Sequence, residues 1–510
     1  MIYALTESAA RRAEERAVAE VGLILEDLMR RAGAAVAREI ETRVPYGAIA
    51  ILAGMGNNGG DGWVAARELA ARNRPTRVFT RMAPEALEGL PAIMAAEATA
   101  GGVAVSVVGD EEMEADALVG YAVIVDAMFG IGLTGSPRQP YASWIDATNA
   151  SGASVIAVDI PSGVEADSGR ADAHCVQADI TVTFSSPKVG LLVHPGAEHA
   201  GDVRVADIGI PWELLGEAGD LELWGMDDYR SLMPCPQTDT HKNELGRVLI
   251  VAGSGAFPGA AALAAMGAQR MGAGYVTLAV PESVAHIMQT KLSSAVVVGL
   301  PENPSRTLAS RVTEEVLDMA KEYDAVVLGP GLTVAHGAVL VARNLVNELQ
   351  LPLVVDADGL NALVYATDAL TARSSPTVIT PHPGEAARLL GMTPAQVQWD
   401  RLGAGARLTG SRCACVLKGA RTIVSGAGRQ IVTMAGGPAL ATAGTGDVLA
   451  GMIGALLAQG LEPLEAGALG AYLHGRAGDH AANILGAPCV IAEDVPAYLP
   501  LAVKELVGEE

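Results

Sequence analysis

An aspartate that follows a glycine turn and precedes an apolar helix is an arrangement suited to phosphoryl transfer. Gly444, Thr445 and Gly446 lead toward a predicted helix over Val448–Ala458. Backbone N–H groups and the helix dipole at such a position form an anion hole for a transferring phosphoryl group. Asp447 is placed to take the proton from an attacking hydroxyl, because an unassisted alcohol is a poor nucleophile. The alternative is that Asp447 only caps the helix, the better interpretation of an isolated Gly-x-Gly-Asp.

A second set of polar residues follows predicted strands in the first half of the chain. Asp126 and Asp159 each close an apolar run. Because the carboxyl ends of neighbouring parallel strands converge on one crevice, these side chains are expected to lie together. The oxygens of Asn58, Asp126 and Ser162 suit a hard cation rather than a transition metal. The alternative for Asp126 and Asp159 is that each only caps the turn after its strand.

The segment GMGNNGGDG lies between a predicted strand, Ala48–Ala53, and a predicted helix, Trp63–Arg72. It contains Gly-x-Gly-x-x-Gly, which also occurs in dinucleotide-binding folds used for hydride transfer, but a lone match is not specific. Asn57, Asn58 and Asp61 are unusual in a plain pyrophosphate loop. Their side-chain oxygens are placed to receive a cation or a polar substrate.

Short apolar runs that alternate with helical stretches must position these residues, and this alternation is typical of parallel α/β folds. In the first half we predict strands at Ala48–Ala53, Thr76–Thr80, Val103–Val107, Ala122–Asp126, Ser154–Asp159 and Ile180–Phe184. In the second half we predict strands at Arg247–Ala252, Tyr275–Ala279, Ala325–Leu328, Leu353–Asp356, Val378–Thr380, Cys415–Lys418 and Thr422–Ser425.

The chain has 510 residues, enough for two or three domains. The alternation of apolar strands and helices is interrupted near Gly219–Thr240, and a new strand-turn-helix unit begins at Arg247. The predicted domains are therefore residues 1–222 and 223–510. The longest uncharged stretch, Val248 to Gln269, contains a proline and several glycines, which favour a strand, a turn and a helix over a membrane span.

The composition excludes several classes of function. With 58 acidic against 35 basic residues, the formal net charge of −23 argues against nucleic acid or an anionic membrane surface as a partner. Five cysteines do not make a disulfide framework, and Cys413 and Cys415 lack the second pair that a zinc site needs. The N-terminus lacks the apolar core of a signal peptide. We expect a soluble, cytoplasmic protein.

The four motifs GNNGGDG, VDAMFGIGLTG, DIPSGVEADSG and TVTFSSPKVGL, taken together, resemble the NAD(P)H-hydrate epimerase domain over roughly residues 1 to 220. That family interconverts the two epimers of a nicotinamide cofactor damaged by addition of water to its ring. The resemblance implies potassium at Asn58, Asp126 and Ser162. It implies substrate contacts at Asn57, Asn58, Gly59, Gly60, Asp61, Gly130, Ile131, Gly132, Leu133, Thr134, Gly135, Ser136 and Asp159. The chain departs from the family at LEDLMRRAG, where ENAG is usual, and at Met55, where proline is common.

Epimerisation at a carbinolamine carbon needs no redox partner. Ring opening or loss of hydroxide gives a planar, iminium-like centre that water can attack from either face. A carboxylate near that centre would stabilise the developing positive charge and shuttle the proton. We assign this role to Asp159, with Asp126 committed to the cation.

The motifs of the second half resemble the ribokinase-like fold, and specifically the ADP/ATP-dependent NAD(P)H-hydrate dehydratase, over roughly 225 to 505. They are GPG (329–331), DADGLN (356–361), TPHPGE (380–385), LKGART (417–422) and AGGPALATAGTGDVLAG (435–451). The resemblance implies that the hydrated cofactor contacts Ala260, Gly331, His382 and Asp447. It implies that the nucleotide contacts Lys418, Gly419, Ala420, Arg421, Thr422, Gly444, Thr445 and Gly446. Magnesium is expected with ADP, which bacterial relatives generally use.

Three positions in the second half keep open interpretations. His382 between two prolines could be a rigid turn residue, and Lys418 could be a solvated strand end. The family often has another glycine after Leu332, where this chain has Thr333, so that loop is expected to close differently.

We predict two α/β domains, an N-terminal Rossmann-like doubly wound sheet and a C-terminal ribokinase-like domain, forming a bifunctional NAD(P)H-hydrate repair enzyme. In this mechanism Asp447 deprotonates the ring hydroxyl, a phosphoryl group transfers onto it, and loss of phosphate regenerates the dihydronicotinamide. The substrates are NAD(P)H-hydrate and ADP or ATP, and a homo-oligomer is expected. One rival is a ribokinase-type small-molecule kinase fused to a nucleotide-binding module. Another is a non-enzymatic sensing or protein-binding role for the first half, and a hydride-transfer dehydrogenase ranks lowest.

Overall fold

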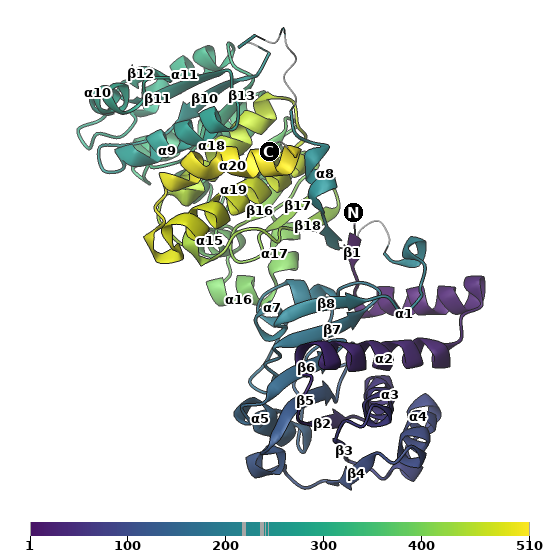
Figure 1. The fold of residues 1–510 in the computed structure, drawn as a ribbon. Coiled ribbons are helices and arrows are strands. Elements are labelled where there is room, and N and C mark those ends of the chain that lie inside the picture. The colour runs from purple at the N-terminus through teal and green to yellow at the C-terminus, as the bar shows by residue number, and fades with distance from the viewer. Residues whose placement is uncertain (1, 217–220, 235–238, 240, 243, 509–510) are drawn as a thin grey trace. The chain divides into compact units, whose positions relative to one another are not determined.

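The computed structural model describes residues 2–216, 221–234, 239, 241–242 and 244–508. The chain divides into two compact units, Ile2–Leu221 and Glu222–Glu510. Gly219 and Thr240, the ends of the segment predicted to separate the domains, lie outside the described residues. Figure 1 shows the fold of each unit.

The first unit is built on a parallel sheet with the strand order β4-β3-β2-β5-β6-β7-β8. Its strands are β1 (Ile2–Ala4), β2 (Ala48–Ala53), β3 (Thr76–Thr80), β4 (Ala104–Val107), β5 (Tyr121–Ala127), β6 (Ser154–Val158), β7 (Ile180–Phe184) and β8 (Asp202–Ala206). Its helices are α1 (Glu7–Arg16), α2 (Leu25–Arg43), α3 (Asn57–Ala71), α4 (Gly89–Ala100), α5 (Tyr141–Ala150), α6 (Val189–Leu192) and α7 (Gly196–His199).

The strand order of the first unit reverses between β2 and β5, which pair in parallel with Leu52 opposite Asp126. Such a switch point opens a crevice at the carboxyl ends of the strands. Helices α2, α3 and α4 lie on one face of the sheet and α5 on the other (Figure 1). Alternating side chains of β2 explain this layering, because Ile49 and Ile51 join one core while Ala50 and Leu52 join the other.

The second unit is built on a longer mixed sheet. From β18 the strand order is β18-β17-β16-β15-β14-β13-β10-β11-β12, parallel from β16 to β12 and antiparallel at β17 and β18. The strands are β10 (Arg247–Val251), β11 (Tyr275–Pro281), β12 (Val296–Leu300), β13 (Ala325–Leu328), β14 (Leu353–Val355), β15 (Thr377–Ile379), β16 (Cys413–Leu417), β17 (Ile423–Gly426) and β18 (Arg429–Val432). A short strand, β9 (Leu221–Leu223), lies at the boundary of the units.

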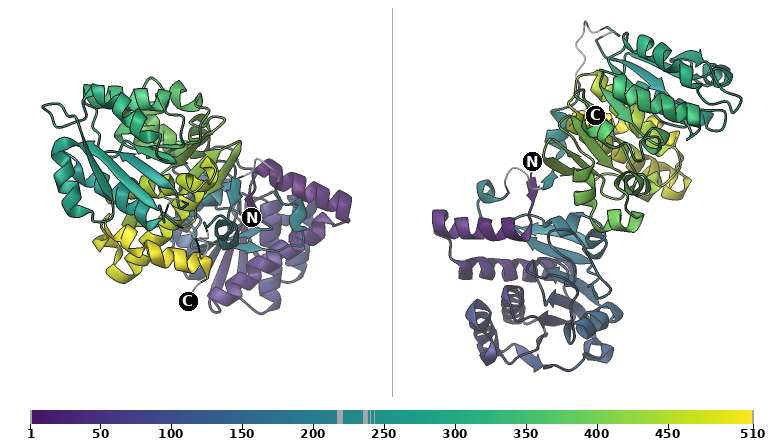
Figure 2. Two further views of the ribbon diagram at one scale, coloured as in Figure 1. Left: turned by 90° about the horizontal axis from the view of Figure 1, so that it is seen from above. Right: turned by 180° about the vertical axis from the view of Figure 1, so that it is seen from behind.

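The helices of the second unit form two layers. They are α8 (Met226–Arg230), α9 (Pro258–Arg270), α10 (Glu282–Lys291), α11 (Thr313–Ala320), α12 (His336–Glu348), α13 (Asp358–Asn361), α14 (Asp368–Thr371), α15 (Pro383–Leu390), α16 (Pro394–Trp399), α17 (Arg401–Arg407), α18 (Thr445–Ala458), α19 (Pro463–Leu485) and α20 (Asp494–Val507). Helices α9, α18, α19 and α20 share one core with the sheet, and α11, α12, α15 and α17 share the other. Figure 2 shows both units from above and from behind.

Both predicted helices beside the glycine motifs begin earlier than expected. Helix α3 begins at Asn57 rather than Trp63, so most of GNNGGDG is helical and only Gly54–Gly56 is a turn. Helix α18 begins at Thr445 rather than Val448, which places Asp447 inside its first turn. Glycines have low helix propensity, but close packing overrides it, against the backbone of Gly54 at the start of α3 and against neighbouring side chains at the start of α18.

The predicted strands are confirmed, with shifts of one or two residues at several ends. Short strands β8, β12 and β18 were not predicted, and β8 and β12 are edge strands with largely exposed or half-buried side chains. The stretch Val248 to Gln269 forms β10, a turn and α9, as predicted. Among the described residues, no helix combines the length and the apolar character needed to cross a membrane.

Candidate active sites

The start of α3 packs directly on the loop that follows β5. A Cβ on Gly54 would collide with the carbonyl oxygen of Met128, and a Cβ on Gly59 would collide with that of Gly54. Glycine is therefore required at both positions by close backbone approach rather than by ligand contact. This packing brings Asn58 to the end of β5, where Asp126 lies.

Asn58, Asp126 and Ser162, the predicted cation ligands, meet around the backbone of Phe129. Asn58 Nδ2 donates to the carbonyl oxygen of Phe129 at 2.9 Å. Ser162 donates to Asp126 twice, from Oγ to Oδ1 at 2.6 Å and from the backbone N–H to Oδ2 at 2.7 Å. Burial raises the pKa of Asp126 to about 6 despite these hydrogen bonds. Met128 N–H also donates to Asp126, at 3.2 Å, so the residue does stabilise its own turn.

Asp159 forms a buried ion pair that the sequence did not predict. Its Oδ1 accepts hydrogen bonds from Lys188 Nζ at 2.5 Å, Thr183 Oγ1 at 3.0 Å and the Phe184 N–H at 3.3 Å. Lys188 is only 3% exposed. Asp159 has φ 64°, a left-handed conformation that aspartate tolerates better than most residues. This conformation turns the chain at the end of β6.

A cavity of about 560 Å³ opens beside these groups. Among the predicted substrate contacts, those that line it are Asn57, Asn58, Asp61, Gly130, Ile131, Gly132, Leu133, Thr134 and Asp159. Gly59 and Gly60 are buried inside α3 instead. Gly135 and Ser136 turn toward the acidic loop that follows, where Ser136 Oγ donates to Asp172 and the Gly135 N–H donates to Glu165. The structure thus gathers most of the predicted contacts at one crevice.

Sequence reasoning missed Arg11, Glu14 and Phe184, which line this cavity, and Lys188, which lines a small pocket that also contains Asp159. Phe184 and Lys188 lie in TVTFSSPKVGL, so this motif could have pointed to them, although the sequence analysis gave neither residue a role. Arg11 and Glu14 come from α1, whose pattern predicts only a charged helix. Their approach to the crevice depends on tertiary packing.

In the second unit, Asp447 lies in the first turn of α18 and does not cap it. Gly444, with φ 97°, is the N-cap residue, and the helix has no side-chain cap. Burial, followed by the nearby charge of Asp356, raises the pKa of Asp447 to about 7. A carboxylate that titrates near neutral pH is suited to act as a general base. The capping alternative for Asp447 is therefore wrong.

Lys418 is paired rather than solvated, so the alternative of a solvated strand end is wrong. Its Nζ lies 2.8 Å from Oδ1 of Asp356, which is 1% exposed and also accepts from Thr380 Oγ1 at 2.7 Å. Burial opposes the charged form of Lys418, but the carboxylates of Asp356, Glu385 and Asp447 outweigh it, so its pKa is raised. A Cβ on Gly446 would lie 3.0 Å from Lys418 Nζ, so this cation faces the start of α18.

Ala260 and Gly331 face each other at the switch point between β10 and β13. A Cβ on Gly331 would approach that of Ala260 to 2.9 Å. In the next turn Thr333 adopts a left-handed conformation, with φ 68°. The Thr333 N–H donates to Asp358 Oδ2 at 2.8 Å, which holds the loop in place.

His382 is the N-cap of α15, and its Nδ1 accepts from the Gly384 N–H at 3.0 Å. This contact bears out the rigid-turn interpretation and leaves a substrate contact as a prediction. Residues Gly419 to Thr422 form the turn between β16 and β17, closed by a hydrogen bond from Thr422 Oγ1 to the Gly419 carbonyl at 3.1 Å. Arg421 in this turn has φ 55°, and burial lowers its pKa.

Two buried basic residues beneath these loops were not predicted. His474 Nε2 lies 2.9 Å from the carbonyl oxygen of Thr445, and burial lowers its pKa to about 4, so the neutral ring donates this hydrogen bond. Arg401 donates to the carbonyl oxygen of Leu417 at 3.2 Å, next to Lys418. Both lie in helices whose sequence patterns show only an apolar face and scattered charges. Only the structure shows that these two side chains are buried beside the loops.

Comparisons with known proteins agree with both units. Residues 248–500 match the NAD(P)H-hydrate dehydratase family, and residues 25–190 match the family described as the YjeF-related protein N-terminus. The chain is 41% identical to the bifunctional NAD(P)H-hydrate repair enzyme Nnr of Moorella thermoacetica, over 94% of this chain and 93% of the relative. It is 38% identical to the enzyme of that name from Thermofilum pendens, over 97% and 94%.

A solved structure supports the fold of the second unit. A ribokinase-like superfamily protein from Enterococcus faecalis is 25% identical, with a TM-score of 0.50, and the match covers 58% of this chain and 99% of that protein. The second unit therefore has the ribokinase-like fold, in which α18 places Asp447 in its first turn. The chain belongs to the family of bifunctional NAD(P)H-hydrate repair enzymes. It combines an NAD(P)H-hydrate epimerase domain with a nucleotide-dependent NAD(P)H-hydrate dehydratase domain.

Proposed function

We propose that the dehydratase, spanning residues 223–510, acts on the S epimer with ADP as phosphoryl donor and Asp447 as base. The observation that carries this proposal is the buried Asp447 in the first turn of α18, with its pKa raised to about 7. Asp447 takes the proton of the ring hydroxyl while the hydroxyl oxygen attacks the terminal phosphorus of ADP, and AMP leaves. Phosphate then leaves the ring carbon and a proton leaves the adjacent carbon, which restores the dihydronicotinamide double bond.

The nucleotide is proposed to lie over Lys418 to Thr422 and Gly444 to Gly446. Lys418 faces Gly446, so its ammonium and the first N–H groups of α18 converge where a phosphoryl group would carry its charge. The hydrated cofactor is proposed to contact Ala260, Gly331 and His382. The pairing of Ala260 with Gly331 at the switch point supports this placement.

Magnesium is proposed to enter with ADP, bound through phosphate oxygens and water. Among the described residues, no cluster of three His, Cys, Asp or Glu side chains forms a ready metal site, which fits an ion that the nucleotide itself carries. Magnesium, when bound, would neutralise charge on the phosphates. The residues of the chain position the hydroxyl and move its proton.

For the epimerase, spanning residues 1–222, we propose potassium at Asn58, Asp126 and Ser162. Carboxylate, amide, hydroxyl and the nearby Phe129 carbonyl oxygens form the kind of donor set that a hard cation prefers. Asp126 is fully buried, and a cation would keep its carboxylate ionised there. Asp159 would stabilise the positive charge on the ring. The predicted contacts that line the crevice would hold the rest of the dinucleotide.

The experiment that tests the proposal supplies mixed hydrate epimers with either ADP or ATP and follows the long-wavelength absorbance of the dihydronicotinamide. Complete recovery with ADP, together with stoichiometric phosphate and AMP, is expected. Recovery that stalls after one epimer would refute the epimerase. An accumulating phosphorylated alcohol would favour the rival small-molecule kinase. The cytoplasmic location and the homo-oligomer stay predictions from the sequence.

A further inference from the structure

A second cavity, of about 420 Å³, adjoins the epimerase crevice and has a different character. It is bounded by apolar side chains of α2 and β7, among them Leu28, Met29 and Phe184. Two carboxylates, Asp61 and Glu14, line both cavities. The polar residues Arg11, Glu15 and Asn57 also line the second cavity. A chamber with an apolar wall, joined to a glycine-lined crevice at two acids, matches a dinucleotide whose ring end enters the chamber.

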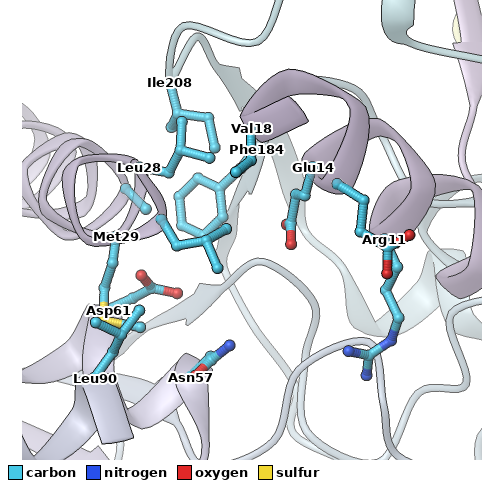
Figure 3. Close-up of a pocket in the computed structure, with 13 residues that line it drawn as sticks. Arg11, Glu14, Val18, Leu28, Met29, Asn57, Asp61, Leu90, Phe184 and Ile208 are labelled. Carbon is cyan, nitrogen blue, oxygen red and sulfur yellow. The ribbon is translucent and has the colours of Figure 1, made fainter. Parts of the chain in front are cut away.

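Asp61 is a buried acid without a described partner. It is 9% exposed and accepts no hydrogen bond from the residues that the structure describes. Figure 3 shows its carboxylate pointing from α3 into the cavity. Burial, and then the charge of Asp159, raises the pKa of Asp61 well above its ordinary value. A buried, unpaired acid aimed into a cavity is expected to meet a polar group of the ligand.

Glu14 points into the same cavity from the other side. Figure 3 shows its side chain descending from α1 toward the space in front of Asp61. Burial raises the pKa of Glu14, Lys188 and Arg11 oppose this shift, and Asp159 reinforces it. With Asp61, Asp159 and Glu14 so close around a single buried lysine, both raised pKa values favour retaining a proton within the group.

Asp159 itself is poorly placed to carry protons. Its Oδ1 is engaged by Lys188, Thr183 and the Phe184 N–H. Protonating this oxygen would break a buried ion pair, which is costly. Epimerisation nevertheless requires a proton donor for the departing hydroxide and an acceptor for the incoming water, on opposite faces of the ring.

We propose that Glu14 and Asp61 are these two catalytic residues, one for each face of the hydrated ring. The inference rests on the proposed epimerase function and deepens it. When the hydroxyl faces Asp61, the acid gives its proton to the hydroxyl and the C–O bond breaks. Water leaves, and the lone pair of the ring nitrogen forms the C=N bond of the iminium.

Inversion is completed on the opposite face. A water molecule forms a new C–O bond there, the electrons of the C=N bond return to nitrogen, and the Glu14 carboxylate takes the proton released by the water. The net change is inversion of one carbon and movement of one proton from Asp61 to Glu14. The other epimer reacts by the reverse sequence, with the two residues exchanging roles.

The test uses the full chain, separated epimers and water labelled with ¹⁸O. In the unmodified protein, label is expected to enter the ring hydroxyl with inversion. In Glu14→Gln, inversion is expected to fall about 100-fold. In this variant, the epimer whose hydroxyl faces Asp61 is expected to keep exchanging its oxygen with water, with retention of configuration. The other epimer is expected neither to exchange its oxygen nor to invert. Asp61→Asn is expected to show the opposite epimer preference.

The control is Glu20→Gln, which removes an exposed carboxylate from the turn after α1 and is expected to leave inversion unchanged. Circular dichroism and thermal unfolding of each variant report that its first unit is folded. If Asp61→Asn does not fold, Glu14→Gln alone tests the proposal. Unchanged inversion in Glu14→Gln would overturn the proposal, as would equal loss of exchange for both epimers. An unmodified protein that does not epimerise would instead refute the proposed function.

Discussion

The ammonium of Lys418 lies 2.8 Å from a carboxylate oxygen of Asp356, at the carboxyl ends of β16 and β14. These strands are not neighbours, since β15 lies between them. The pair therefore bridges the end of β15 and places the Lys418 ammonium beside Gly446, at the start of α18. Asp356 holds that cation and also contributes to the raised pKa of Asp447.

Replacing Lys418 by methionine should reduce both stability and dehydration. The buried Asp356 would lose its partner, which costs about 3 kcal/mol of unfolding free energy. The double variant Lys418→Met/Asp356→Asn should recover most of this stability in denaturant titrations but not the dehydratase activity. Full activity of the double variant would contradict a phosphate-facing role for Lys418.

Dehydratase kcat/KM should fall as pH drops below about 7, because Asp447 must be deprotonated to act as base. The charged groups that face it are Asp356, Lys418, Asp358 and Glu385. The slope should approach tenfold per pH unit, and the residual activity of Asp447→Asn should lack this limb. A flat profile between pH 5 and 8 in the unmodified protein would exclude the assignment.

The raised pKa of Asp447 also predicts that stability changes with pH in the direction opposite to activity. The folded state binds the Asp447 proton more tightly than the unfolded chain, so its contribution to unfolding free energy declines as pH rises from about 4 to about 7. Asp447→Asn should therefore raise Tm more at pH 8 than at pH 4. Equal Tm changes at both pH values would show that the carboxylate is not perturbed by folding.

His474 should act by orienting the anion hole. In a trans peptide the carbonyl and the following N–H point in opposite directions, so holding the Thr445 carbonyl aims the Gly446 N–H toward the nucleotide. His474→Phe should lower stability by about 1–3 kcal/mol and raise KM for ADP, because the carbonyl loses its donor. His474→Gln, which retains an N–H donor, should restore much of the affinity. Equal effects of Phe and Gln would indicate a packing role only.

Thr333→Gly should stabilise the second unit. The left-handed φ of 68° is strained for a β-branched residue and costs about 1–2 kcal/mol. Glycine relieves this strain, but its greater freedom in the unfolded chain offsets part of the gain. A gain of roughly 1 kcal/mol in denaturant titrations is expected. Thr333→Ala, which keeps a Cβ, should show no such gain. A loss of stability in the glycine variant would contradict the strain.

The sequence predicted the positions of most strands well, because buried parallel strands are continuous apolar runs such as Ile49–Leu52. It also predicted Asp126 with Ser162, because both follow strands that meet at one edge of the sheet. It could not predict the helical state of Asn57–Gly60, since glycine propensity points the other way. Nor could it predict Glu14 or His474 as members of the sites, because their approach depends on how helices and loops pack.

The most direct test of the central claim is a single-turnover experiment on the pure S epimer with ADP, comparing the unmodified protein with Asp447→Asn. The account predicts that dihydronicotinamide appears with one phosphate and one AMP in the unmodified protein, and about 10²–10⁴-fold more slowly in the variant. Epimerisation by the variant should be normal, since Asp159 and Asp126 are untouched. Equal rates of dehydration in the two proteins would contradict the account.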